Sequence, residues 1–350
     1  MKQAIHFGIE RAKSAGHWLK RKMEPRGAVL LYHRVANESF DPQLLCVSPG
    51  NFASHLEKLR KWARPIRLKD MTADIGRGRL PRKAVALTFD DGYADNLAHA
   101  KPLLMKYDMP ATFFVTAGYI GRDREFWWDE LERLLLGPNT LPQTLSLRVG
   151  GENLRWDLGK SARYGHGAFR RRRAWHVLEK KDPTPRHAAY RFLQPRLLRL
   201  PDPDIQKILR RLRKIAQTGP SARPSHRCLT AEETIQLKAD GAFEVGSHTL
   251  SHPFLSSLED AAQREEIQGA KLRLEAILNH PVSSFSYPYG SPSSYTSQTV
   301  SRVKESGLAR ACANIQAPVS PGVDIFRLPR MIVRNWDGDE FAGRLKSFLR

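Results

Sequence analysis

The sequence contains little cysteine, no long apolar run and no pattern of a secretory leader. Its three cysteines, Cys46, Cys228 and Cys312, are widely spaced and include no CxxC pair. An odd, scattered set argues against a disulfide framework and indicates a reducing compartment or thiols buried as packing residues. No run approaches the roughly 18 apolar residues of a transmembrane helix. The first 22 residues lack an apolar centre and a small-residue cleavage site. We therefore expect a protein that is cytoplasmic or peripheral at a membrane.

Positive charge is abundant: 57 Lys and Arg face 36 Asp and Glu, which gives a net charge of +21 and a pI near 10.2. Nucleic acid, anionic lipid and acidic glycan are all physically possible partners of such a chain, and charge alone does not choose among them. Residues 1–26 form a basic segment. It is either a short helix lying on an anionic membrane surface or a solvated terminus.

Strand and helix patterns alternate along most of the 350 residues, 41% of which are hydrophobic. This content suffices for a sizeable core. Apolar strand patterns occur at 27–33, 84–90, 111–117, 243–247, 283–287, 308–313 and 326–333. About seven strands in βα alternation predict an α/β fold, and a barrel more than an open sheet.

Three helix starts are marked by capping residues. Ser48-Pro49 predicts a helix over 49–62, and Thr230 with Glu233 forms a capping-box pattern. Ser257 with Asp260 suggests an N-cap before a long helix that ends near residue 278.

The alternation breaks between residues 121 and 228. This segment holds 24 Lys and Arg against 11 Asp and Glu, an excess of 13, and includes four consecutive arginines at 170–173. Helical patterns and proline-rich joints predict a mostly helical basic insertion over 121–227. The barrel is then expected over 27–120 and 228–350. The insertion either covers the active site and binds an anionic partner or has a solvated basic face.

The strongest chemical signal is the end of the strand at 84–90. The apolar run Ala84 to Phe89 stops at two adjacent carboxylates, Asp90 and Asp91, followed by Gly92. Acids at the carboxyl end of a buried parallel strand are typical of active sites. Neighbouring aspartates project in different directions, so one can bind a metal while the other acts as a base. The alternative is an Asp-Gly turn with solvated acids.

A second signal follows the strand at 243–247, where His248 and His252 lie four residues apart. Pro253 biases His252 away from helical dihedrals, which favours a loop at the end of the strand. Most such pairs are surface or capping histidines. Combined with Asp91, the pair would supply two imidazoles and a carboxylate and leave coordination positions open for water and substrate.

Three motifs together resemble the polysaccharide deacetylases, the NodB-homology group or carbohydrate esterase family four. They are Thr88-Phe89-Asp90-Asp91-Gly92-Tyr93, His248-Thr249-Leu250-Ser251-His252 and Tyr287-Pro288-Tyr289-Gly290. The resemblance covers about 28–120 and 228–334 and excludes the basic insertion. It implies a distorted (β/α)7 barrel and metal-dependent hydrolysis of N- or O-acetyl groups on sugars.

By position, the resemblance assigns roles to the motif residues. Asp90 would be the catalytic base and a metal-bound water the nucleophile. Asp91, His248 and His252 would hold a divalent metal, with zinc expected. The backbone N–H of Tyr289, next to Pro288, would help to bind the oxyanion of the reacting acetyl group.

The sequence departs from the family pattern at two positions. Ser286 stands where the third motif commonly begins with an arginine that steadies the catalytic aspartate. Arg330 is our candidate replacement, with Arg327 second.

No histidine follows His280, so the C-terminal Leu-x-His motif that commonly supplies the general acid is missing. Tyr32-His33 is similar to the N-terminal Tyr-His motif of one branch of the family, which makes His33 the candidate acid. The alternative is that His33 caps its strand or orients another ligand.

We therefore expect a hydrolase of carbon–nitrogen bonds that deacetylates a polysaccharide or glycolipid sugar, such as N-acetylglucosamine. The two departures also permit a non-catalytic glycan-binding relative. Nucleic-acid binding through the insertion ranks last because the insertion has no helix-turn-helix or zinc-finger signature. The expected partners are an acetylated glycan or glycolipid and an anionic membrane surface, without specific nucleic acid.

Overall fold

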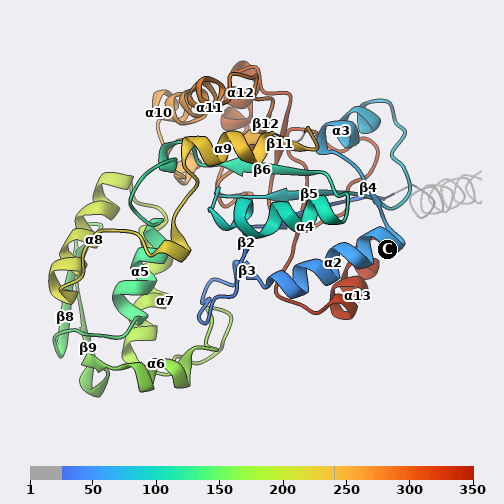
Figure 1. Ribbon diagram of the computed structural model, residues 1–350. Coiled ribbons are helices and arrows are strands. Elements are labelled where there is room, and N and C mark those ends of the chain that lie inside the picture. Colours follow the sequence, from blue (N-terminus) through green and yellow to red (C-terminus); the bar gives the residue numbers. More distant parts are fainter. Residues whose placement is uncertain (1–25, 240) are drawn as a thin grey trace, which may run out of the picture.

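The computed structural model describes residues 26–239 and 241–350 (Figure 1). The prediction for the basic segment 1–26 lies, except for Arg26, outside the described residues. Among the described residues, no helix combines the length and apolarity that crossing a bilayer requires.

Seven parallel strands form the central sheet, in the order β13-β12-β11-β6-β5-β1-β14. In chain order they are β1 (Ala28–Tyr32), β5 (Ala84–Phe89), β6 (Ala111–Val115), β11 (Phe243–Ser247), β12 (Ser284–Ser286), β13 (Arg310–Cys312) and β14 (Met331–Ile332). Short β4 (Arg64–Pro65) adds an eighth strand beside β5. An isolated parallel bridge joins Cys312, at the end of β13, to Leu328, which lies three residues before β14. The predicted α/β fold with a distorted barrel is confirmed.

Strands β1, β5 and β6 are buried along their whole length. Strands that are covered on both faces have continuous apolar sequences, so these strands could be predicted from the sequence. Their side chains contribute to the main core together with helices that surround the sheet. These helices are α2 (Pro49–Trp62), α3 (Leu68–Gly76), α4 (Lys101–Lys106), α9 (Ala231–Lys238), α10 (Asp260–Arg264), α11 (Ala270–Leu278), α12 (Ser297–Glu305) and α13 (Gly338–Phe348).

Two of the three predicted helix caps are confirmed. Ser48 Oγ accepts from the Asn51 N–H at 3.2 Å, and the Thr230 capping box is complete. The prediction for Ser257 was wrong, because Glu259 occupies the N-cap of α10. The Ser257 hydroxyl instead donates to the Phe254 carbonyl at 2.8 Å within a 3-10 turn.

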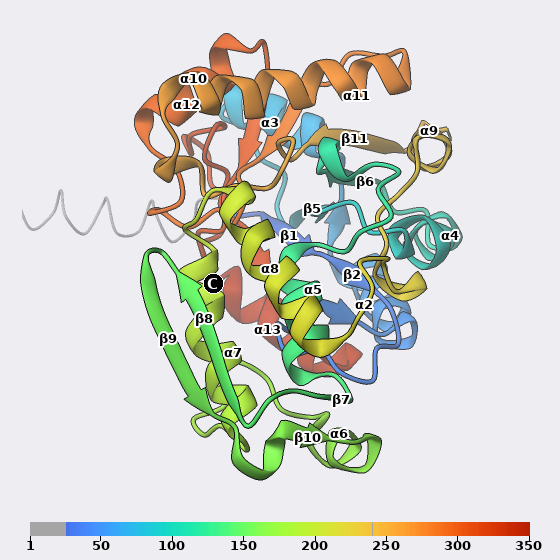
Figure 2. The ribbon, with the colours of Figure 1, turned by 90° about the vertical axis from the view of Figure 1, so that its left-hand side faces the viewer.

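Residues 121–227 form a lobe at the carboxyl ends of the barrel strands (Figures 1 and 2). It contains α5 (Trp127–Leu136), α6 (His166–Arg172), α7 (Pro185–Leu197) and α8 (Asp202–Ala216). Their hydrophobic core also takes in Phe40, Tyr93, Tyr119 and Cys228 from outside the lobe. The sequence reading missed a hairpin of β8 (Thr144–Val149) and β9 (Glu152–Asp157) in this lobe. The sequence signal for it was the alternation of apolar Leu145, Leu147 and Val149 with polar residues, and these three side chains are buried.

Candidate metal and catalytic site

Asp90 lies directly after β5 and is held by an arginine from the far end of the chain. Arg330 donates to both Asp90 carboxylate oxygens, at 2.8 and 2.7 Å, and Ser286 Oγ donates to one of them at 3.0 Å. Arg330 is 0% exposed and Asp90 is 2% exposed. Burial alone would raise the pKa of Asp90, but the charge and hydrogen bonds of Arg330, with the facing imidazoles, lower it below its usual value. Asp90 is therefore ionised at neutral pH.

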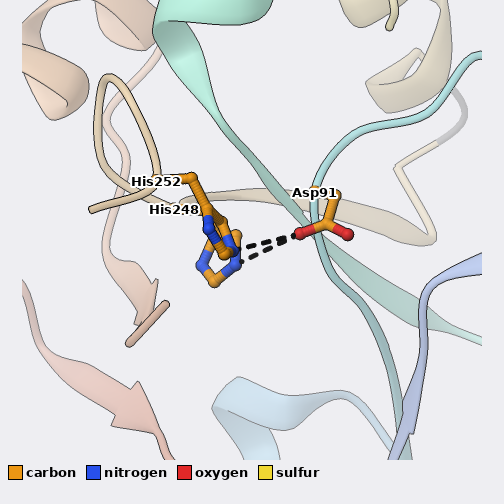
Figure 3. Close-up of side chains that lie close together, drawn as sticks. All are labelled: Asp91, His248 and His252. Atoms are coloured by element: carbon orange, nitrogen blue, oxygen red, sulfur yellow. Dashed lines mark ion pairs between the residues drawn. The ribbon is translucent and has the colours of Figure 1, made fainter. Parts of the chain in front are cut away.

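Asp91 points toward His248 and His252, as Figure 3 shows. Its Oδ1 lies 3.5 Å from His248 Nε2 and 3.4 Å from His252 Nε2. All three ligand atoms lie within 4.8 Å of one another. Ligand bonds of about 2.0–2.2 Å around a tetrahedral ion set its donor atoms about 3.4 Å apart. The donor set and these spacings fit a divalent ion such as zinc.

Hydrogen bonds outside this triad orient its imidazoles. His248 Nδ1 lies 2.8 Å from the Ser286 carbonyl, which fixes Nδ1 as the donor and leaves Nε2 free to face Asp91. Glu266 accepts from the backbone N–H groups of Leu250 and Ser251, both at 2.9 Å. The loop between the two histidines is therefore anchored to the helical segment Glu265–Gly269. This glutamate was not identified from the sequence, which gives no motif for it.

The backbone around the triad adopts positive φ at four non-glycine residues. The values are 78° at Asp91, 65° at Thr249, 61° at His252 and 60° at Tyr289. Such conformations cost of order 1–3 kcal/mol each and cluster at functional sites. Three of the four, Asp91, His252 and Tyr289, line one pocket, which supports a functional role for that pocket.

The pocket opens at the carboxyl ends of the strands and has a volume of about 110 Å³. Its lining residues are His33, Gln43, Leu45, Asp90, Asp91, Trp127, Trp128, Gln194, His248, His252, Tyr289 and Asn314. His33 therefore shares one cavity with both aspartates. Burial lowers the pKa of His33 below its ordinary value, although the charges of Asp91 and Asp90 oppose this shift.

Tyr289 presents an available backbone donor. Its N–H has no hydrogen-bond partner among the described residues, whereas its carbonyl accepts from Asn314 Nδ2 at 2.7 Å. The preceding Pro288 is buried but does not line the pocket. A fixed, unpaired N–H beside the triad is suited to binding an oxyanion.

The lobe supplies two tryptophans to the site. The Trp128 ring lies edge-to-face with His252, with 4.8 Å between ring centres, and Trp127 Nε1 donates to the Tyr289 hydroxyl at 3.3 Å. Trp128 is anchored in turn, because its Nε1 donates to the hydroxyl of Tyr93 at 2.9 Å. The consecutive aromatic residues Phe126, Trp127 and Trp128 in the basic segment indicate a substrate groove or an interface. The sequence does not indicate that Trp128 contacts His252.

The structure brings the predicted site residues together with two exceptions. Pro288 does not line the pocket, and Arg327, the second candidate for the arginine role, lies elsewhere. Arg327 pairs with Asp324 at 3.9 Å and is partly exposed. A separate buried group of Asp129, Glu132 and His226 also converges within 4.8 Å. Arg223 donates to Glu132 at 3.0 Å, so this second group already has a cation.

The Asp90–Arg330 pair leads to a stability prediction. Arg330→Met should lower the free energy of unfolding at pH 7 by about 3–5 kcal/mol, because it leaves a buried carboxylate without its partner. Urea denaturation would measure this loss. Arg327→Met, which changes a partly exposed arginine, should stay within about 0.5 kcal/mol of the unmodified protein. Adding Asp90→Asn to Arg330→Met should recover part of the loss, and strictly additive losses would contradict the assigned coupling.

Comparison with known proteins identifies relatives of the barrel. The family model described as polysaccharide deacetylase matches residues 77–140 and 212–311. It therefore omits residues 141–211, the middle of the lobe. A poly-beta-1,6-N-acetyl-D-glucosamine N-deacetylase of Staphylococcus aureus is 29% identical over an alignment of 118 positions, which covers 30% of this chain and 41% of that protein. The chain thus matches about two fifths of the length of this relative.

Solved structures share the fold over most of the chain. The Streptococcus pyogenes deacetylase PplD, in complex with acetate, has a TM-score of 0.57 at 17% identity and covers 94% of this chain and 100% of its own. IcaB from Ammonifex degensii has a TM-score of 0.57 at 20% identity, with 92% and 97% covered. At these identities the likeness demonstrates the fold alone.

Proposed function

Because this chain belongs to the polysaccharide deacetylase family, we propose that it hydrolyses the acetamide of an N-acetylated sugar in a polysaccharide. The observation that carries the proposal is the different environment of two adjacent buried aspartates. Asp90 is paired with an arginine, whereas Asp91 faces two imidazoles. Acid–base sites typically place neighbouring titratable groups in different surroundings, so that each group can take a different role.

Asp91, His248 and His252 would hold the divalent metal, and zinc suits two imidazoles and a carboxylate. When bound, such an ion supplies Lewis acidity, which lowers the pKa of water from 15.7 to roughly 7 and polarises a carbonyl. His248 Nδ1 is engaged by the Ser286 carbonyl, so its Nε2 is the atom available to the ion.

Asp90 would accept the proton of the attacking water. Arg330 keeps this carboxylate ionised and fixes its orientation through two hydrogen bonds. The N–H of Tyr289 would donate to the oxyanion that forms on the acetyl carbon, since it has no other partner among the described residues. Asp90 and Tyr289 line the same pocket, so both groups can reach an acetamide bound there.

His33 is the proposed general acid, because an amine leaves more easily once it is protonated. Its lowered pKa makes the protonated ring a stronger acid than free histidine, although a smaller fraction of it is protonated at pH 7. His33→Ala should therefore lower kcat on the order of 10²–10⁴-fold and leave metal affinity unchanged. Steady-state kinetics with metal titration would measure both quantities. A parallel loss of metal affinity would assign His33 to orienting a ligand, and near-normal turnover would remove it from catalysis.

A glycan of N-acetylglucosamine is the proposed substrate class, by extension from the Staphylococcus aureus relative, a poly-beta-1,6-N-acetyl-D-glucosamine N-deacetylase. The metal-loaded protein can be incubated with N-acetylated and O-acetylated sugar oligomers, and free acetate measured. Acetate from the N-acetylated oligomers alone supports the proposal. Binding of these oligomers without acetate release would instead support the non-catalytic glycan-binding alternative.

An anionic membrane surface or acidic lipid-linked glycan is the proposed second partner of the lobe. The basis is the excess of 13 positive charges in residues 121–228. Sedimentation with anionic vesicles should retain more protein than sedimentation with neutral vesicles, and the difference should shrink as salt rises to physiological concentration. Equal retention by both kinds of vesicle would contradict this role.

A further inference from the structure

Helix α7 of the lobe crosses beside the pocket and contacts the rim at two separated places. At one, Gln43 Nε2 donates to the Tyr190 hydroxyl at 2.6 Å. At the other, just beyond the end of the helix, the Arg199 guanidinium lies over the Phe254 ring, 5.4 Å from its centre. Gln194, four residues after Tyr190 and so on the same face of the helix, lines the pocket between these contacts. The helix therefore forms one wall of the pocket.

The rim segment 41–46 forms a second wall and is tied from both sides. Arg334, from the barrel, donates to the Leu44 carbonyl, and the Val177 N–H, from the lobe, donates to the Pro42 carbonyl at 2.9 Å. The Asp41 carboxylate accepts from the Leu45 and Cys46 N–H groups at 2.9 and 2.8 Å. These bonds make the segment a fixed part of the pocket that does not need substrate to form.

The third wall is Trp127 and Trp128 at the base of the lobe, which are 2% and 6% exposed. The space that remains is about 110 Å³. For comparison, a cavity of about 150 Å³ engineered in another protein holds benzene. The pocket therefore admits an acetamide group and part of the ring that carries it, and the rest of the substrate lies at its open mouth.

We propose that the pocket receives its sugar end-on, so that the substrate is a terminal acetylated sugar unit and not a unit inside a glycan chain. A unit within a chain has neighbours on two opposite sides and requires a groove that is open at both ends. Helix α7, joined to the segment 41–46 through Tyr190 and Gln43 and to Phe254 through Arg199, stands across one end of such a groove. The proposal deepens the proposed function and rests on it for the identity of the acetylated sugar.

Saturation-transfer NMR on the metal-loaded Asp90→Asn variant tests the proposal without requiring turnover. The probes are three pentamers of N-acetylglucosamine, with a ¹³C-labelled acetyl group on the reducing-end, middle or non-reducing-end unit. The acetyl group of one end unit should receive at least several-fold more saturation than that of the middle unit. Equal transfer to the middle unit, or transfer to none of the three, would overturn the proposal. If the wild-type protein binds the oligomer end-on but releases no acetate, the proposed function is refuted and the end-on proposal stands.

A matched pair of variants tests the role of α7. Gln194→Trp fills the pocket and should weaken binding of the end-labelled pentamer tenfold or more. Arg196→Trp places the same side chain at an exposed position of the same helix and should leave binding unchanged. Circular dichroism would verify that both variants are folded. Equal affinities of two folded variants would overturn the assignment of Gln194 to the pocket wall.

Discussion

Replacing Asp90 with asparagine is expected to lower kcat on the order of 10²–10⁴-fold while the protein keeps its metal. Asparagine preserves the shape of the side chain but removes the carboxylate that would accept the proton of the attacking water. The metal should remain because Asp90 Oδ2 is engaged by Arg330 and Ser286, whereas Asp91 faces both histidines. Kinetics with an acetylated oligomer, together with metal analysis of the same sample, would measure both effects.

Asp91→Asn provides the matched comparison for this prediction. It makes the same chemical change one residue away, yet it removes a proposed ligand, so it should lower metal affinity as well as turnover. Loss of metal from the Asp90 variant, or full metal retention by the Asp91 variant with reduced turnover, would contradict the division of labour between the two aspartates.

The second large effect is expected for His252→Ala. Removing a group that orients a metal ligand typically lowers metal affinity about 10–100-fold, so removal of a ligand itself should lower it by more than that. Competition with a chromophoric chelator would measure the affinity. Turnover at limiting metal should fall in parallel and recover in part when metal is added in excess.

His280→Ala is the control for this variant, since His280 is exposed and lies with Ala111 and Phe243 at the amino-terminal ends of β6 and β11, opposite the ends that carry the site. It should leave metal affinity unchanged. An unaltered metal affinity of the His252→Ala variant would exclude His252 as a ligand. The metal would then need a different set of donors.

The position of the candidate site could be predicted from sequence because its motif residues follow the ends of buried parallel strands. Asp90 follows β5, and His248 follows β11, so the apolar runs located both side chains on one edge of the sheet. The arginine and the general acid, for which the usual family motifs are missing, were harder to assign. Arg330 lies 240 residues from Asp90 in the chain, and only the barrel topology brings the two together.

The lobe could be predicted much less well. Its charge was interpreted as surface charge, yet Arg186 is 0% exposed and donates to the carbonyls of Ser161 and Ala162, at 2.6 and 2.7 Å. Arg223 is likewise occupied by Glu125 and Glu132. Some of the arginines that make the segment basic therefore stabilise the interior of the lobe. Composition does not separate such arginines from solvated ones, because the distinction depends on tertiary contacts.

The contribution of the lobe to the pocket was also hidden from sequence. Gln194 carries no motif, and its place beside the site follows from how α7 packs against the segment 41–46. Only the aromatic pair Trp127-Trp128 gave a hint, since large rings in a basic segment are typical of a groove or an interface.

Mass spectrometry of an N-acetylglucosamine oligomer after incubation with metal-loaded protein tests the central claim most directly. The products should lose one acetyl mass per reacted unit, and a chelator should stop this loss. The Asp90→Asn variant should bind metal but fail to catalyse the loss. An oligomer whose mass stays unchanged with wild-type protein of full metal content would contradict the account.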